Sequence, residues 1–129
     1  MGLNYLMDSN VIIDYTGENF TGSAELKLDT AFNGVFYYSI ISRIEVIGFN
    51  TDAAILQDLH DFLALGQQYY VTDEIAIQTI FIRRALTRIK MSDAIIAATA
   101  LVHHHTLVSR NLHDFKIIPG LKVIDPYTL

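Results

Sequence analysis

Four acidic residues from separated segments have the type and spacing to do chemistry together: Asp8, Glu45, Asp93 and Asp114. Asp8 directly follows the apolar run over residues 5–7. Burying a bare carboxylate there is costly unless a cation or a hydrogen-bond donor meets it. Mg²⁺ and Mn²⁺ prefer carboxylate oxygens and water, and a cation makes a cluster of mutually repelling carboxylates tolerable. Sites of this kind perform phosphoryl chemistry, so we expect a phosphodiester or phosphate ester as substrate.

Each of these acids also has a purely structural explanation. Asp93 would open a helix, where the macrodipole favours a negative charge, and Asp114 in "NLHDF" could form an Asx turn. Glu45 could take the exposed position of an amphipathic helix. Asp8 has the weakest explanation of this type, because the end of a buried strand is a poor place for an unpaired charge. One shared metal site explains the set more economically than four separate causes.

The hydrophobic pattern predicts alternating strands and helices that position these acids. We expect strands over residues 3–7, 35–39, 69–71, 106–108 and 121–124. We expect helices over residues 18–32, 41–49, 51–66 and 93–105. A further short helix should be capped by Ser9 or Asn10 and run to Tyr15. Another should be capped by Thr72 or Asp73, with one face formed by Ile75, Ile82, Leu86 and Ile89. Ser92 is the expected cap of the helix over 93–105.

This alternation predicts an α/β fold with a central parallel sheet and helices on both faces. Open sheets of this class bind ligands beyond the carboxyl ends of their strands. The four acids follow or adjoin those ends, so we expect them on one rim of the sheet.

The composition limits the class of protein further. The absence of Cys excludes disulfides and thiolate metal sites. A net charge of −5 argues against a protein that coats nucleic acid, unless several acids face one cleft and hold cations. Without repeats or linkers, residues 1–129 are expected to form a single domain. We find neither a signal peptide nor an apolar run near the ~20 residues of a membrane span, and expect a cytoplasmic protein without membrane contact.

Five stretches resemble the PIN-domain ribonucleases in order and approximate spacing: "LMDSNVIIDY", "SRIEVIGF", "KMSDAIIAATAL", "LVSRNLHDF" and "PGLKVIDPY". They are most similar to VapC-type toxins of type II toxin–antitoxin systems, and the resemblance runs from Leu3 to about Tyr127. It implies a three-layer α/β/α sandwich formed by a single PIN domain. It also implies an endoribonuclease that cuts RNA, with tRNA or rRNA as candidate targets, by a metal-activated water and without a covalent intermediate. A cognate antitoxin protein and a homodimer are the implied partners.

The resemblance also assigns roles to individual residues. The four family acids correspond to Asp8, Glu45, Asp93 and Asp114, with Mg²⁺ or Mn²⁺ as the cofactor. Asp8 and Asp93, with or without Glu45, would hold the main cation, and Asp114 would serve a second cation or position the attacking water. The supporting polar positions of the family correspond to Ser9, Asn10, Ser109 and Asn111. Ser9 and Asn111 would orient carboxylates or the scissile phosphate.

Five of the nine basic residues gather toward Asp93 and Asp114 along the sequence: Arg83, Arg84, Arg88, Lys90 and Arg110. They could contact the phosphates of RNA or could belong to an ordinary solvated helix face. Ile77 and Phe81 would lie on the exposed flank of the same helix, where a homodimer interface could form.

The run His103–His105 invites a metal-binding interpretation, but consecutive helical residues point in different directions and cannot all bind one ion. We expect a solvated helix end there, where His suits the negative pole of the dipole.

Other classes of protein fit the sequence less well. A haloacid-dehalogenase-like phosphatase would need a second Asp at position 10, which is Asn10, and no P-loop or dinucleotide-binding motif occurs. A non-catalytic PIN-like RNA-binding or scaffold module is the remaining alternative. The loss of an acid would favour that alternative, and all four acids are present.

Overall fold

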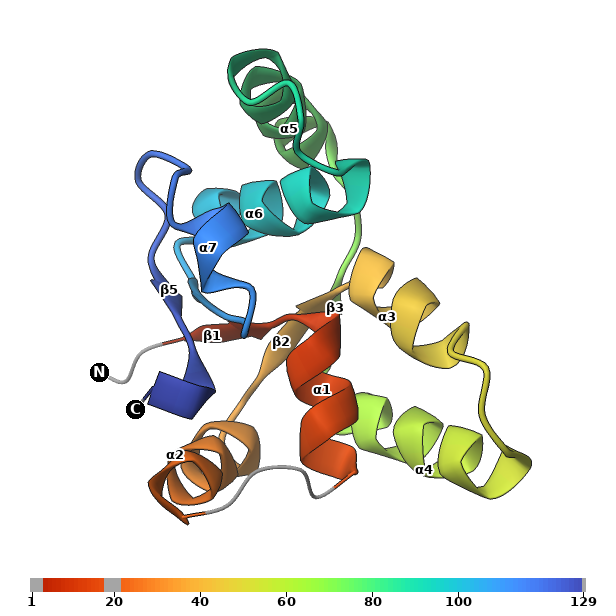
Figure 1. The fold of residues 1–129 in the computed structure, drawn as a ribbon. Coiled ribbons are helices and arrows are strands. Elements are labelled where there is room, and N and C mark those ends of the chain that lie inside the picture. Colours follow the sequence, from red (N-terminus) through yellow and green to blue (C-terminus); the bar gives the residue numbers. More distant parts are fainter. Residues whose placement is uncertain (1–3, 18–21, 129) are drawn as a thin grey trace.

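The computed structural model describes residues 4–17 and 22–128 (Figure 1). A single parallel sheet has the strand order β3-β2-β1-β4-β5. Its strands are β1 (Tyr5–Met7), β2 (Tyr37–Ser39), β3 (Gln67–Tyr69), β4 (Thr106–Val108) and β5 (Val123–Ile124). The helices of the described residues are α1 (Ser9–Thr16), α2 (Gly22–Asn33), α3 (Ile40–Ile47), α4 (Ala53–Ala64), α5 (Asp73–Ala85), α6 (Met91–His103), α7 (Leu112–Phe115) and the 3₁₀ turn η1 (Pro126–Thr128).

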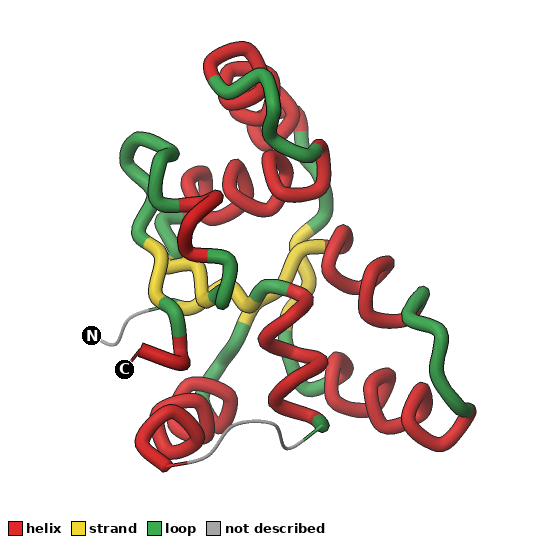
Figure 2. Tube along the Cα trace, viewed as in Figure 1, coloured by secondary structure: helices red, strands yellow, loops and turns green. Residues whose placement is uncertain are grey.

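Helices cover both faces of the sheet, and the strands lie between two groups of helices (Figure 2). Alternate strand residues point to opposite faces. Met7 and Val108 pack in one core cluster with α1, α2 and α4, whereas Leu6 and Leu107 pack in a second cluster with α5 and α6. The expected α/β/α sandwich is confirmed. Within the described residues no helix has the length and apolarity needed to cross a membrane.

The central position of β1 determines where the sheet can bind a ligand. The chain runs from β1 outward to β2 and β3, then returns to place β4 and β5 on the other side of β1. The direction of winding therefore reverses between β1 and β4, where open parallel sheets form a crevice at their carboxyl edge. The backbone N–H of Asp8 donates to Val108 O at 2.9 Å and continues the ladder to that edge.

Helix α6 is buried on nearly all sides, as its apolar sequence predicts, and it opens with Asp93 in its first turn. The predicted cap at Ser92 is wrong, because the helix begins at Met91, two residues earlier than expected, and Lys90 occupies the cap position without a side-chain bond. The predicted cap of α1 at Ser9 or Asn10 is also wrong. Asp8 caps that helix, and its Oδ1 accepts the Ser9 N–H at 2.8 Å.

Several boundaries differ from the sequence-based expectation. Strand β3 covers Gln67–Tyr69 instead of residues 69–71, because this edge strand pairs through its backbone and needs no apolar run. Helix α5 ends at Ala85, so Leu86 and Ile89 lie beyond it, although both pack on the same core cluster. The short helix α7 was not expected. Residues 18–21 of the expected helix 18–32, and residue 3 of the first strand, lie outside the described residues.

The expected solvated end at His103–His105 is wrong for His105. Helix α6 ends at His103, and His104 adopts a left-handed conformation with φ 58°. This reversal carries His105 into the interior, where it is 6% exposed and stacks on Tyr37 at 4.5 Å between ring centroids. Tyr69 Oη lies 2.6 Å from His105 Nε2.

Candidate active site

Asp8 is buried at the end of β1 and held by three donors. Its Oδ1 accepts the Ser9 N–H at 2.8 Å, and its Oδ2 accepts the Ser109 hydroxyl at 2.7 Å and the Asn10 amide at 3.4 Å. Burial raises the pKa of Asp8 to about 6; the bonds from Ser109 and Ser9 oppose this rise, and the charges of Asp93 and Glu45 add to it. Asp8 is therefore a carboxyl group that is fixed in place by hydrogen bonds but has no cationic partner among the three donors.

Glu45 comes to the same place from α3. The Ser9 hydroxyl donates to Glu45 Oε1 at 2.6 Å and joins the start of α1 to α3. Helix α3 itself begins at the Ser39 cap, directly after β2, so the carboxyl edge of the sheet sets its position. Ser9 thus contacts two acids, by its backbone N–H and by its side chain.

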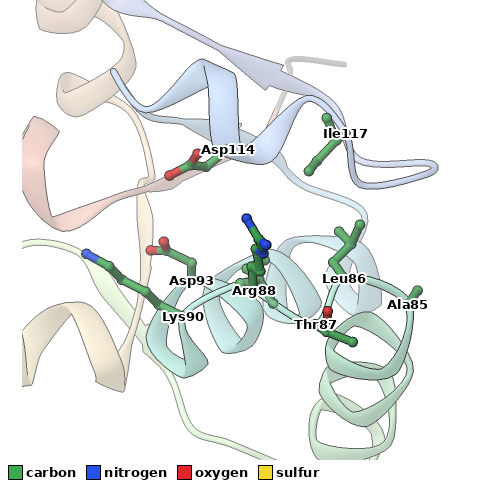
Figure 3. A pocket seen from close by; sticks show the side chains of 9 residues that line it. Ala85, Leu86, Thr87, Arg88, Lys90, Asp93, Asp114 and Ile117 are labelled. Carbon is green, nitrogen blue, oxygen red and sulfur yellow. The ribbon is translucent and has the colours of Figure 1, made fainter.

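Asp93 and Asp114 lie on α6 and α7, with their carboxylates one above the other in Figure 3. Burial raises the pKa of Asp93; Lys90 opposes the rise, and the charges of Glu45 and Asp114 reinforce it. The charges of Glu45 and Asp114 therefore lie close enough to Asp93 to affect its ionisation.

A hydrogen-bonded chain connects Asp8 with the exposed Asp114. The Ser109 hydroxyl donates to Asp8, the Asn111 N–H donates to Ser109 Oγ at 3.0 Å, and the Asn111 amide donates to Asp114 Oδ2 at 2.9 Å. The loop after β4 therefore holds the acids of β1 and α7 in one arrangement.

Two adjoining cavities collect these residues. The first, here the Asp8 cavity, has a volume of about 520 Å³ and is lined by Asp8, Ser9, Asn10, Ile13, Asp14, Glu45, Phe49, Lys90, Ser92, Asp93, Arg110 and Asn111. The second, here the Arg88 cavity, has a volume of about 410 Å³ and is lined by residues 85–90 with Asp93, Asp114 and Ile117 (Figure 3). Lys90 and Asp93 border both cavities, so all four predicted acids meet within one region.

Of the predicted basic residues, Arg88, Lys90 and Arg110 line the cavities. Arg83 and Arg84 are exposed on α5 and line neither of the two.

Sequence reasoning missed Asp14, which lines the Asp8 cavity and is buried. Arg110 Nη1 lies 2.9 Å from Asp14 Oδ2. The signal was a charge inside the apolar run "VIIDY", which requires a partner that the local sequence does not contain.

The donor set suits a hard cation, because Asp8, Glu45 and Asp93 border the Asp8 cavity together with Asp14, and its lining contains neither Cys nor His. Burial raises the pKa values of Asp8 and Asp93, neighbouring acids add to the rise, and a cation beside them would favour the ionised forms. In the part of the chain that the structure describes, no group of three or more His, Asp or Glu side chains is yet arranged to hold an ion. The acids are gathered but do not form a closed cage.

Comparison with known proteins agrees with this architecture. The family model of the PIN domain matches residues 5–121. A toxin–antitoxin complex from Klebsiella pneumoniae contains a similar chain, with 28% identity, a TM-score of 0.79, and coverage of 96% of this chain and 98% of that one.

Two DNA-bound complexes share the fold at lower identity. VapBC2 from Rickettsia felis, bound to a promoter fragment, has 20% identity, a TM-score of 0.81, and coverage of 95% and 98%. VapBC from Salmonella typhimurium has 23% identity, a TM-score of 0.80, and coverage of 97% and 99%. No curated protein sequence matches the chain. The match over residues 5–121 spans most of the sequence, and the chain belongs to the PIN domain family.

Proposed function

We propose that this PIN domain is a Mg²⁺- or Mn²⁺-dependent endoribonuclease and the toxin of a toxin–antitoxin pair. The observation that carries the proposal is the convergence of four acids, from β1 and three helices, on two adjoining cavities at the carboxyl edge of the sheet. The similar chains in a Klebsiella toxin–antitoxin complex and in VapBC complexes support the toxin assignment.

Asp8, Glu45 and Asp93 would hold the main cation, and Asp114 would serve a second cation or accept a hydrogen bond from the attacking water. When bound, the metal supplies positive charge at the phosphate and lowers the pKa of water. The protein's own polar groups orient the acids: Ser109 fixes Asp8, Ser9 fixes Glu45, and Asn111 fixes Asp114.

The basic residues of the two cavities would bind the negatively charged phosphates of the substrate. Arg88, Lys90 and Arg110 lie beside the acids, where phosphates on either side of the cut would lie. Hydrolysis then forms a bond from water oxygen to phosphorus and breaks the bond to one ribose oxygen, without a covalent enzyme intermediate. RNA is the proposed substrate class, with tRNA and rRNA as candidates.

The proposed partners are a cognate antitoxin and a second copy of the chain. The antitoxin assignment derives from the toxin–antitoxin complexes of similar chains. The dimer assignment derives from three exposed apolar side chains on α5, Ile77, Ile80 and Phe81. We propose the cytoplasm as the location, because the proposed RNA substrates are found there.

A non-catalytic PIN-like scaffold is the second candidate. It is favoured by one observation, that the described acids do not yet form a group able to hold an ion. The two candidates differ in their response to metal. A metal site raises the melting temperature with added Mn²⁺ by mass action, and the Asp93→Asn variant should respond less, whereas a scaffold should not respond.

Cleavage of total bacterial RNA by the purified protein tests the proposal. We expect cleavage with Mg²⁺ or Mn²⁺, none with excess EDTA, and none by Asp93→Asn. Attack by water leaves phosphate monoester ends. Full cleavage by Asp93→Asn or in EDTA would contradict the proposal, as would 2′,3′-cyclic phosphate ends, because these require attack by the ribose 2′-hydroxyl.

A further inference from the structure

Asp14 on α1 joins two distant parts of the chain beside the acids. Its Oδ2 atom receives Arg110 Nη1 at 2.9 Å and accepts the Tyr127 hydroxyl at 3.2 Å. Arg110 follows β4, and Tyr127 belongs to η1, which follows the neighbouring strand β5. The Asp14 side chain is 11% exposed, whereas that of Arg110 is 49% exposed. The carboxylate is thus the anchored member of the pair, and the guanidinium is the member that faces solvent.

The backbone of Arg110 is tied to the same region. Its N–H lies 3.4 Å from Asn10 Oδ1, and its neighbours Ser109 and Asn111 belong to the hydrogen-bonded chain from Asp8 to Asp114. Arg110 is therefore held by its backbone and by its side chain, and it lines the Asp8 cavity. A surface arginine without such contacts loses side-chain conformational entropy when it binds a ligand. Arg110 loses much of this entropy when the protein folds, before any ligand binds.

The ion pair between Asp14 and Arg110 adds little to the stability of the fold, because one of its members is half-exposed. It also reduces the positive charge that Arg110 offers to an anion. The ion pair instead fixes the orientation of the Arg110 guanidinium. A guanidinium has five N–H donors in a planar fork, and those not used by Asp14 suit a phosphate.

We propose that Asp14, assisted by Tyr127, is a positioning residue that holds the Arg110 guanidinium at the rim of the Asp8 cavity, where it binds a substrate phosphate next to the acids. This rests on the proposed function, because it takes a phosphodiester as substrate. Arg110 contacts the substrate, and Asp14 acts through Arg110.

Loss of Arg110 and loss of Asp14 then have different consequences. Arg110→Gln removes a phosphate contact, so both affinity and rate should fall. Asp14→Asn leaves the guanidinium fully charged but free to move, and makes the cavity less negative. Substrate should bind as well or better, while the phosphate is held less accurately during the reaction.

RNA binding tests the role of Arg110 without requiring turnover. In an Asp93→Asn background, anisotropy of a labelled single-stranded RNA of mixed sequence gives the Kd and its salt dependence. Arg110→Gln should weaken binding about tenfold and lower the salt slope by about one. Arg43→Gln is the matched control, because it removes the same charge from an exposed position of α3 outside both cavities.

The outcomes separate this inference from the proposed function. If Arg110→Gln and Arg43→Gln have equal effects while the protein with intact acids cuts RNA, the inference is overturned and the proposed function stands. If no form binds RNA and the protein with intact acids cuts none, both are overturned.

Steady-state kinetics with the acids intact test the role of Asp14. Asp14→Asn should lower kcat about ten- to a hundredfold with KM unchanged or lower, because misplacing a bound group slows the reaction. Tyr127→Phe should do so more weakly, and Arg110→Lys should keep more affinity than rate, because lysine lacks the planar fork. Melting temperatures check that each variant folds. A raised KM with unchanged kcat in Asp14→Asn would overturn the positioning role.

Discussion

Asp8 and Ser109 are joined by a 2.7 Å hydrogen bond in which the Ser109 hydroxyl donates to Asp8 Oδ2. The two residues follow the adjacent central strands β1 and β4. This bond lowers the pKa of Asp8 against the effect of burial, so it favours the ionised carboxylate that a cation needs. It also joins the ends of β1 and β4, the two strands between which the direction of winding reverses.

Removal of this hydroxyl should weaken metal binding. In Ser109→Ala, Asp8 loses a donor to its charged form and Asn111 N–H loses its acceptor. We expect the Mn²⁺ affinity at pH 7, measured by isothermal titration calorimetry, to fall about tenfold. Ser109→Thr keeps the hydroxyl and is the control. Equal affinities for the alanine variant and the unaltered protein would contradict this role.

Asp8→Asn should stabilise the metal-free protein at neutral pH. The folded pKa of about 6 lies above the ordinary value of 3.8, so ionised Asp8 opposes folding. Its unfavourable contribution grows as the pH rises from about 4 to about 6 and is then constant, reaching about 3 kcal/mol at most. Asparagine retains the helix cap.

Urea unfolding in EDTA measures this effect. The variant should exceed the unaltered protein by about 1–3 kcal/mol at pH 7.5 and by less at pH 5. Saturating Mn²⁺ should reduce or reverse the difference, because only the unaltered protein keeps the ligand. A less stable variant in EDTA at pH 7.5 would show that ionised Asp8 does not oppose folding.

His105 should make the protein less stable in mild acid. Burial lowers its pKa from 6.5; the backbone of Asn4 opposes this shift, and the charges of His103 and His104 add to it. The neutral form is therefore the folded form, and its stabilising contribution, complete above pH 6.5, is lost as the pH falls through the folded pKa.

The comparison of unfolding free energies from pH 7.5 to pH 5 isolates this contribution. His105→Gln should be less stable at pH 7.5, and its disadvantage should shrink at pH 5. His60→Gln is the control for the loss of an imidazole, because His60 lies exposed on α4 outside the core. A constant difference between His105→Gln and the unaltered protein would contradict the prediction.

Gly66 should not tolerate a side chain. A Cβ at this position would overlap the ring of the buried Phe36, with Cζ and Cδ2 at 2.7 and 2.9 Å. Phe32 and Phe62 pack against that ring and limit its movement. Gly66→Ala should therefore reduce the free energy of unfolding by about 1–3 kcal/mol. Gly34→Ala, whose Cβ meets nothing closer than 3.9 Å, should change it far less.

The sequence predicted the layers and the acids because both follow from local patterns. The alternation of apolar runs with caps places Asp8 and Asp93 at the starts of α1 and α6, although the cap residues themselves were misassigned. The roles of these acids in metal binding remain predictions.

Features that depend on distant partners could not be predicted. His105 is buried because Tyr37 and Tyr69 come from two other strands. Asp14 has its partner in the loop after β4, so the local sequence shows only an unexplained charge. The predicted position of β3 was wrong by two residues, because the register of this edge strand depends on its pairing with the backbone of β2 and not on apolar residues.

The central claim is that the gathered acids cut RNA, and mapping new RNA 5′ ends in cells tests it most directly. The ends are compared after brief induction of the unaltered protein and of Asp93→Asn. We predict new ends at one or a few sites that are absent with the variant, which would also identify the target RNA. The same ends with both proteins, or no new ends with either, would contradict the catalytic claim and favour the scaffold.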